Sequence, residues 1–100
     1  MCGVAGSVYF QQVSKENIAS DLNKMLEHIE HRGPDAHGVW VHGNNQVGFG
    51  HSRLSILDLS EAGSQPMRSH SDRFCISYNG EIYNHLKLRK ELNHNINWQG

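Results

Sequence analysis

CGVAGSVYF, at residues 2–10, is the stretch that sets the fold. Its small and β-branched residues predict a strand over residues 3–10. Ser14 is then a suitable N-cap for a helix. Beyond it, apolar side chains recur every three or four residues, at Ile18, Leu22, Met25, Leu26 and Ile29. This one-sided stripe predicts an amphipathic helix to about Glu30, which the Gly-Pro pair at residues 33–34 would end.

After the helix, the chain returns to strand-like runs separated by turn residues. Residues 38–42 and 46–51 read as a hairpin, because Gly43-Asn44-Asn45 between them supplies turn chemistry. Residues 53–57 either extend the second strand or begin a new one. Residues 59–67 contain Ser, Glu, Gly and Pro and read as a loop.

The last third of the chain predicts one more strand and one more helix. Residues 73–78 read as a strand with a tight Asn79-Gly80 turn after it. Asn84 is placed to cap a helix over residues 85–92, with Leu88 and Leu92 on one face. The order strand, helix, hairpin, strand, helix predicts the α+β class.

Composition excludes several classes of function. The 100 residues make one domain or part of one, and 37% hydrophobic with 19% charged residues is typical of a globular chain. A net charge of -1 without a basic cluster argues against nucleic acid and against an anionic membrane surface. No apolar run is long enough to span a bilayer, and no secretory signal precedes the strand. The two cysteines, Cys2 and Cys75, therefore fit a reducing cytoplasm.

Cys2 is the first candidate for chemistry. If Met1 is removed, Cys2 carries both a thiol and a free α-amine, whose ordinary pKa lies near ~8. A nucleophile and a base then share one residue, which is the arrangement of N-terminal nucleophile catalysis. The alternative is that a cysteine follows the initiator by accident. Cys75, inside a predicted strand, reads as an ordinary buried thiol.

Four ordered segments closely resemble class II glutamine amidotransferases, and within them the glutaminase domain of glutamine-hydrolysing asparagine synthetases. The segments are CGVAG at 2–6, HRGPD at 31–35, GHSRLSI at 50–56 and YNGEIYN at 78–84. The resemblance implies an N-terminal nucleophile hydrolase, of which residues 1–100 would form the N-terminal part of a four-layer αββα sandwich. It also implies an amidotransferase domain truncated at its C-terminal end, because the family's further aspartate-bearing segment does not occur here.

The resemblance assigns roles to matching positions. Cys2 would be the nucleophile, and the Asn79 side chain and Gly80 N–H would stabilise the oxyanion. From the residues alone, Asn79-Gly80 favours a type I′ turn, and the two interpretations are compatible because a tight turn can aim the donors. Arg53 would clamp the substrate carboxylate through its planar fork, and its alternative is a surface arginine. Leu54 and Ile56 would offer further contacts to glutamine, and Glu81 would pair with its α-ammonium.

Two other features have weaker assignments. The segment HRGPD at 31–35 is expected to be architectural, with a local ion pair between Arg32 and Asp35. Eight histidines raise the question of a metal, but their spacing matches no zinc pattern, so no metal ligand is predicted.

The resulting functional expectation is hydrolysis of L-glutamine to glutamate and ammonia through a thioester on Cys2. The chain needs no cofactor for this step. ATP and Mg²⁺ are expected only in a C-terminal synthetase domain, which would use the ammonia to make asparagine. Alternatives are an inactive amidotransferase-like module, an amidotransferase of cell-surface polysaccharide synthesis and a metal-binding structural fragment. Residues 1–100 alone are expected to be inactive, and to form homo-oligomers or depend on further chain for stability.

Overall fold

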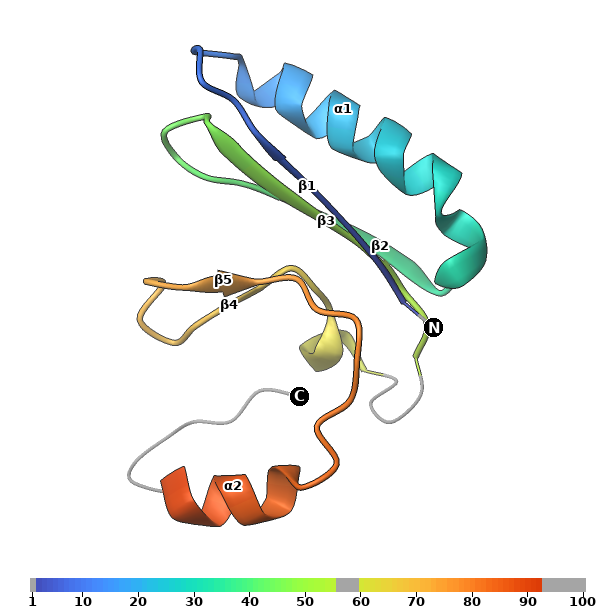
Figure 1. Cartoon of the computed structure of the whole chain (residues 1–100), viewed down its shortest axis with the longest axis vertical. Coiled ribbons are helices and arrows are strands. Elements are labelled where there is room, and N and C mark those ends of the chain that lie inside the picture. The colour runs from blue at the N-terminus through green and yellow to red at the C-terminus, as the bar shows by residue number, and fades with distance from the viewer. Residues whose placement is uncertain (1, 56–59, 93–100) are drawn as a thin grey trace.

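A three-stranded antiparallel sheet with one helix on its face forms the larger part of the fold (Figure 1). The computed structural model describes residues 2–55 and 60–92. Strands β1 (Gly3–Val8) and β2 (Ala36–Val41) flank the central β3 (Val47–Arg53). The register pairs Gly3 with Ser52 across one side of β3 and Ala36 with Arg53 across the other. The first strand and the hairpin are thereby confirmed, with boundaries shifted by about two residues.

Helix α1 (Lys15–His28) is the amphipathic helix that the apolar stripe predicts. The Ser14 Oγ accepts a hydrogen bond from the Asn17 N–H at 3.1 Å, so this N-cap is confirmed. Ile18, Leu22 and Leu26 are fully buried and form the core, whereas Met25 at the edge of the stripe remains 38% exposed. The helix ends at His28, and a 3-10 turn, η1 (Glu30–Arg32), carries the chain to the Gly-Pro pair.

Two glycines let α1 lie close to the central strand. A Cβ built at Gly48 would lie 2.6 Å from the Leu22 Cδ1, and one at Gly50 would lie 3.2 Å from the Leu26 Cδ2. Larger residues at these positions would push the helix away from the sheet. Because side chains alternate along a strand, His51 and Arg53 of β3 face the opposite side of the sheet. This second face is the one that carries the candidate site.

The next two strands are much shorter than expected. Strands β4 (Met67–Arg68) and β5 (Cys75–Ile76) pair with each other in a separate two-stranded sheet. The predicted strand over 73–78 is therefore wrong in length, although its centre is right. The tight turn at Asn79-Gly80 is wrong too, since among the described non-glycine residues only Asn45 and Asp72 have a positive φ. A type I′ turn requires a positive φ at both central residues.

Helix α2 (His85–Leu92) begins after Asn84, as the sequence predicts. The Asn84 carbonyl accepts the Leu88 N–H at 3.1 Å, and no side chain of this helix is buried. Figure 1 shows α1, the three-stranded sheet, the β4–β5 hairpin and α2 in succession from one end of the molecule to the other. The α+β class is confirmed. Within the described residues, no helix has the length and apolarity needed to cross a membrane.

Candidate active site

The Cys2 sulfur is held where the central strand leaves the sheet. The Leu54 N–H donates to the Cys2 Sγ at 3.3 Å, and the thiol lies 3.6 Å from the Leu54 carbonyl, to which it donates. A Cβ at Gly3 would meet Ile29 on the helix side, so Cys2, one residue earlier, is directed to the opposite face. The half-buried Cys2 therefore shares its face with Arg53 and His51.

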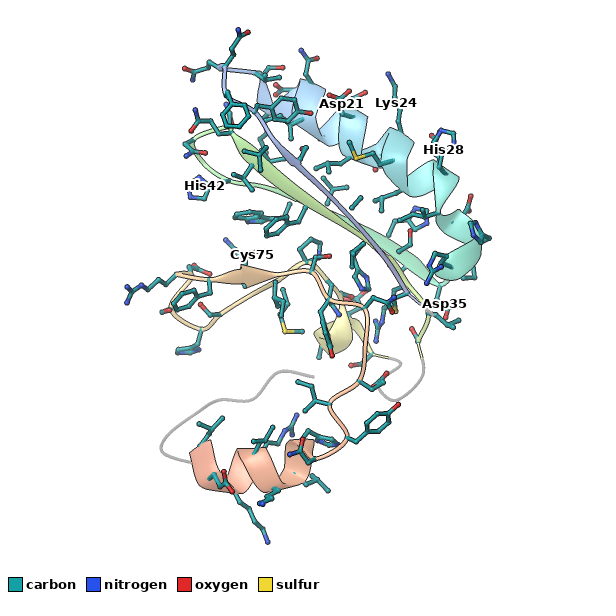
Figure 2. All side chains as sticks on the ribbon, viewed as in Figure 1. Asp21, Lys24, His28, Asp35, His42 and Cys75 are labelled. Atoms are coloured by element: carbon teal, nitrogen blue, oxygen red, sulfur yellow. The ribbon has the colours of Figure 1, made fainter. Side chains whose placement is uncertain are left out.

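The loop over residues 31–35 contacts the Cys2 corner, the end of the sheet where Cys2 lies beside the residues that follow β3. The Arg32 Nε donates to the Cys2 carbonyl at 3.4 Å, and the Asp35 Oδ2 accepts the Ser55 N–H at 2.7 Å. The expected ion pair between Arg32 and Asp35 is wrong, because each side chain reaches a different backbone group instead. Figure 2 shows Asp35 at the end of the sheet where β1 begins. These contacts fit an architectural role for the loop.

Arg53 is the last residue of β3 and is only 8% exposed. Its Nη1 donates to the Ser60 carbonyl at 2.7 Å, which restrains the guanidinium. An arginine buried to this extent is not an ordinary surface arginine. The alternative of a surface arginine at this position is therefore contradicted, and the site gains a buried cation on the same face as Cys2.

The segment that carries Asn79 lies against the same strand. The His51 Nε2 lies 3.0 Å from the Tyr78 carbonyl, and the Ser77 Oγ donates to the Gly50 carbonyl at 3.0 Å. His51 in turn is opposite Val4 of β1. Asn79, one residue beyond Tyr78, thus lies over the half of the sheet that ends at Cys2.

The remaining candidate residues differ in exposure. Asn79 is half-buried, and its side-chain amide makes no hydrogen bond within the described part of the chain. Gly80 and Glu81 are exposed to solvent. Ile56 and Met1 lie outside the described residues, so the roles expected of them stay predictions.

His51 is a buried neutral imidazole. It is 1% exposed, and burial lowers its pKa below the ordinary value of 6.5, with the neighbouring Arg53 charge acting in the same direction. The bond to the Tyr78 carbonyl opposes this shift. A carbonyl only accepts, so the imidazole proton belongs on Nε2, and the buried Nδ1 has no partner among the described residues. Protonation of Nδ1 would create an unpaired buried donor beside a cation.

We therefore expect the protein to lose stability on acidification through His51. As the pH falls, His51 of the unfolded chain takes up a proton around its ordinary pKa of 6.5, whereas His51 of the folded chain does so only at lower pH. The contribution of neutral His51 to stability is therefore complete above pH 6.5 and is lost as the pH falls through the lowered pKa of the folded state. His51→Gln keeps an N–H donor but cannot titrate, and its thermal midpoint should fall less between about pH 7.5 and about pH 5.5. His70→Gln, at an exposed position, is the matched control. Parallel curves for His51→Gln and the wild-type protein would contradict this prediction.

The second thiol lies in a different environment. Burial raises the pKa of Cys75, which the charge of Arg68 partly offsets. Figure 2 shows Cys75 on the β4–β5 hairpin, away from the corner where β1 begins. The same figure separates His28 on α1 from His42 at the β2–β3 turn. Over residues 2–55 and 60–92, no group of three His, Cys, Asp or Glu side chains is arranged to hold a metal ion.

Sequence reasoning missed the residues that attach the Asn79 segment to the sheet. His51 could have been predicted, because the alternation of side chains along a strand puts it on the same face as Arg53. Ser77 and Gln65 gave no such signal. The Gln65 Oε1 accepts the Tyr78 N–H at 2.6 Å across thirteen residues of chain, a pairing that no local pattern indicates.

Comparisons with known proteins match the whole chain. The glutamine amidotransferase domain family matches residues 1–100. The chain is 42% identical, over 93% of its length, to a putative glutamine-hydrolysing asparagine synthetase of Methanocaldococcus jannaschii. It is 44% identical over 92% of its length to asparagine synthetase 3 of Bacillus subtilis, and 35% identical over 92% to the amidase chry2 of Gibberella zeae.

These relatives are much longer than the chain. The aligned region makes up 21% of the archaeal synthetase and 15% of each of the other two proteins. The likeness is thus to one domain of each relative.

Proposed function

The chain belongs to the glutamine amidotransferase domain family, and from that membership we propose that it hydrolyses the side-chain amide of L-glutamine with Cys2 as nucleophile. The observation that carries the proposal is the position of the Cys2 sulfur, 3.3 Å from the Leu54 nitrogen and on the same sheet face as the buried Arg53. The thiol, the Leu54 N–H that donates to it and the buried Arg53 thus all belong to the end of the sheet where β3 stops. The fold and the family together favour glutaminase chemistry over a purely structural role.

The nucleophilic step uses groups at the start of β1. The Cys2 thiolate attacks the amide carbon of glutamine, and the bond to nitrogen then breaks to release ammonia and leave a thioester on the sulfur. Water hydrolyses the thioester to glutamate and restores the thiol. With Met1 removed, the α-amine of Cys2 is the base that takes the thiol proton and returns it to the leaving nitrogen. The Leu54 N–H is placed to stabilise negative charge on the sulfur.

The tetrahedral intermediate needs donors for its oxygen. Asn79 supplies its side-chain amide and Gly80 its backbone N–H. The half-buried Asn79 supports this role, because its amide has no competing partner within the described residues. Gly80 lacks a Cβ that would keep the substrate oxygen away.

Substrate recognition is assigned to the two charged groups on the α-carbon of glutamine. Arg53 binds the α-carboxylate and Glu81 the α-ammonium, with Leu54 and Ile56 providing further contacts. Arg53 is only 8% exposed as a residue, so its charge is weakly screened and its interaction with a carboxylate is strong. Glu81 is exposed and becomes effective only when the substrate covers it.

The proposal extends to the rest of the fold. We infer a four-layer αββα sandwich, in which further strands would cover the sheet face opposite α1. Val4 and Val8 of the edge strand β1 lie on that face and are 47% and 64% exposed, so they offer apolar surface that such a layer could cover. The order of layers in Figure 1 is compatible with this arrangement.

For the whole protein, we propose that the ammonia serves ATP-dependent asparagine synthesis in the cytoplasm. The archaeal and bacterial relatives are named as asparagine synthetases, which supports asparagine synthesis as the use of the ammonia. A C-terminal synthetase domain would then be the partner of this domain, and ATP and Mg²⁺ would bind there. The described residues of this chain take part only in releasing ammonia.

The test is ammonia release from L-glutamine by the full-length, Met1-free protein, measured with a coupled glutamate dehydrogenase assay. Arg53→Lys should lower kcat/KM about 10²-fold, mainly through a higher KM, because a point charge replaces a bidentate fork. Arg73→Lys, at an exposed site beside Phe74, is the matched control and should leave both constants unchanged. No ammonia above background from the wild-type protein would exclude the proposed function, and an unchanged KM in Arg53→Lys would exclude the clamp.

A further inference from the structure

Both backbone polar groups of Tyr78 are held by side chains from elsewhere in the fold. The Gln65 Oε1 accepts its N–H at 2.6 Å, and the His51 Nε2 donates to its carbonyl at 3.0 Å. The preceding residue adds a third attachment, from the Ser77 Oγ to the Gly50 carbonyl at 3.0 Å. Strand β5 ends at Ile76, so these three bonds replace the ladder that would otherwise hold the backbone.

The consequence for Asn79 follows from the planar peptide bond. The Tyr78 carbonyl and the Asn79 N–H belong to one rigid unit, so fixing the carbonyl fixes the plane from which Asn79 continues. His51 is itself rigid, because it lies in the central strand between Val4 and Gly38 and is 1% exposed. The strand that ends beside Cys2 therefore sets the position of Asn79.

We propose that His51, assisted by Gln65, is a positioning residue that sets the Asn79–Gly80 donors against the reacting carbonyl. The inference rests on the proposed function of Cys2 but concerns residues that touch neither substrate nor nucleophile. A histidine suits the task because its ring is stiff, has a donor at Nε2 and reaches a backbone carbonyl across the sheet face. Without this attachment, the half-buried Asn79 and the exposed Gly80 would move relative to the strand end, and a displacement of about 1 Å can cost about 10²-fold in rate.

The experiment compares His51→Leu with His51→Gln in the full-length, Met1-free protein. Gln can place an amide N–H where the His51 Nε2 is, whereas Leu cannot. His51→Leu should lower kcat for glutamine hydrolysis about 10²-fold with little change in KM, and His51→Gln should recover most of kcat. His70→Leu, at an exposed position, should behave as wild type. Equal kcat for His51→Leu and wild type would overturn the proposal, as would equal losses in the Leu and Gln variants.

A double-mutant cycle separates positioning from a general loss of packing. In an Asn79→Ala background, His51→Leu should cause a smaller further loss of kcat than it causes in the wild-type protein, because only the Gly80 donor is left for His51 to position. Full additivity would show that His51 acts elsewhere and would overturn the proposal. If His51→Leu fails to fold, Gln65→Met provides the same test, because it removes the other side-chain hydrogen bond to Tyr78 at a half-buried position.

Amide hydrogen exchange gives a readout that does not depend on catalysis. The backbone amides of Asn79 and Gly80 should exchange faster in His51→Leu than in His51→Gln, and the amides of α1 should not change. If the wild-type protein releases no ammonia but these rates still separate, the glutaminase proposal fails and the positioning role stands. Unchanged rates at both amides would overturn the positioning role whatever the activity.

Discussion

Cys2→Ala is expected to abolish ammonia release from L-glutamine, with a loss of about 10⁴-fold or more in kcat. The variant removes the only atom that can form the proposed thioester, while its smaller side chain fits the half-buried site beside Leu54. If the full-length protein carries out the proposed ammonia-dependent synthesis, that activity should continue in Cys2→Ala, because the reaction would not use the Cys2 corner. Steady-state ammonia release and product formation from added ammonium, measured on the same preparation, check both statements.

Cys75→Ala is the matched control for this result. Both cysteines are half-buried, but burial raises the pKa of Cys75, and this residue lies on the hairpin away from the Cys2 corner (Figure 2). A thiol of raised pKa is a poor nucleophile at neutral pH, so Cys75→Ala should retain glutaminase activity. A glutamine-shaped chloroketone should likewise label Cys2 alone. Loss of activity in Cys75→Ala, or label on Cys75 by peptide mapping, would contradict the assignment of Cys2.

The elements that local patterns define were predictable. The stripe that contains Ile18, Leu22 and Leu26 predicts α1, and Ser14 marks its beginning within one residue. The hairpin around Asn45 follows from alternating residues and turn chemistry, and Asn45 has the φ of 57° that such a turn requires. These features depend on residues close in the chain, so the sequence carries them directly.

The segment before Asn79 was mispredicted for the opposite reason. Arg73 to Tyr78 has strand-like composition, but only Cys75 and Ile76 find a partner strand. Beyond them, the Tyr78 backbone is satisfied by Gln65 and His51, which are remote in sequence. A strand needs a partner ladder as well as suitable residues, and side-chain hydrogen bonds can replace that ladder. Tertiary contacts therefore decided both the strand length and the absence of the tight turn.

The candidate site shows the same difference between what a local motif indicates and what depends on contacts between distant residues. Cys2, Arg53 and Asn79 were predicted as site residues because their motifs resemble a known family, and the sheet brings Cys2 and Arg53 to one face. What the motifs did not give is how the site is held together. The Leu54 N–H on the Cys2 sulfur and the Arg32 contact to the Cys2 carbonyl both span more than twenty-five positions. The structure also replaces the expected Arg32–Asp35 ion pair by two separate backbone contacts.

Asn79→Ala is expected to lower kcat for glutamine hydrolysis by about 10²–10³-fold, with KM nearly unchanged. The amide of Asn79 acts on an oxygen that is fully charged only in the tetrahedral intermediate, so its loss affects the transition state more than substrate binding. Stability should change little, because the side chain makes no hydrogen bond within the described residues and its backbone has no positive φ. Steady-state kinetics and a thermal melt on the same sample measure both quantities.

Asn45→Ala is the control that separates an oxyanion donor from a turn residue. Asn45 has a φ of 57° in the β2–β3 turn, so alanine there should cost about 1 kcal/mol of stability and leave kcat unchanged. The two asparagines then give opposite patterns: Asn45→Ala lowers the melting temperature without affecting kcat, and Asn79→Ala lowers kcat without affecting the melting temperature. If Asn79→Ala instead loses stability and keeps its kcat, the Asn79 side chain is structural. The oxyanion of this site would then have to be stabilised by backbone N–H groups such as that of Gly80.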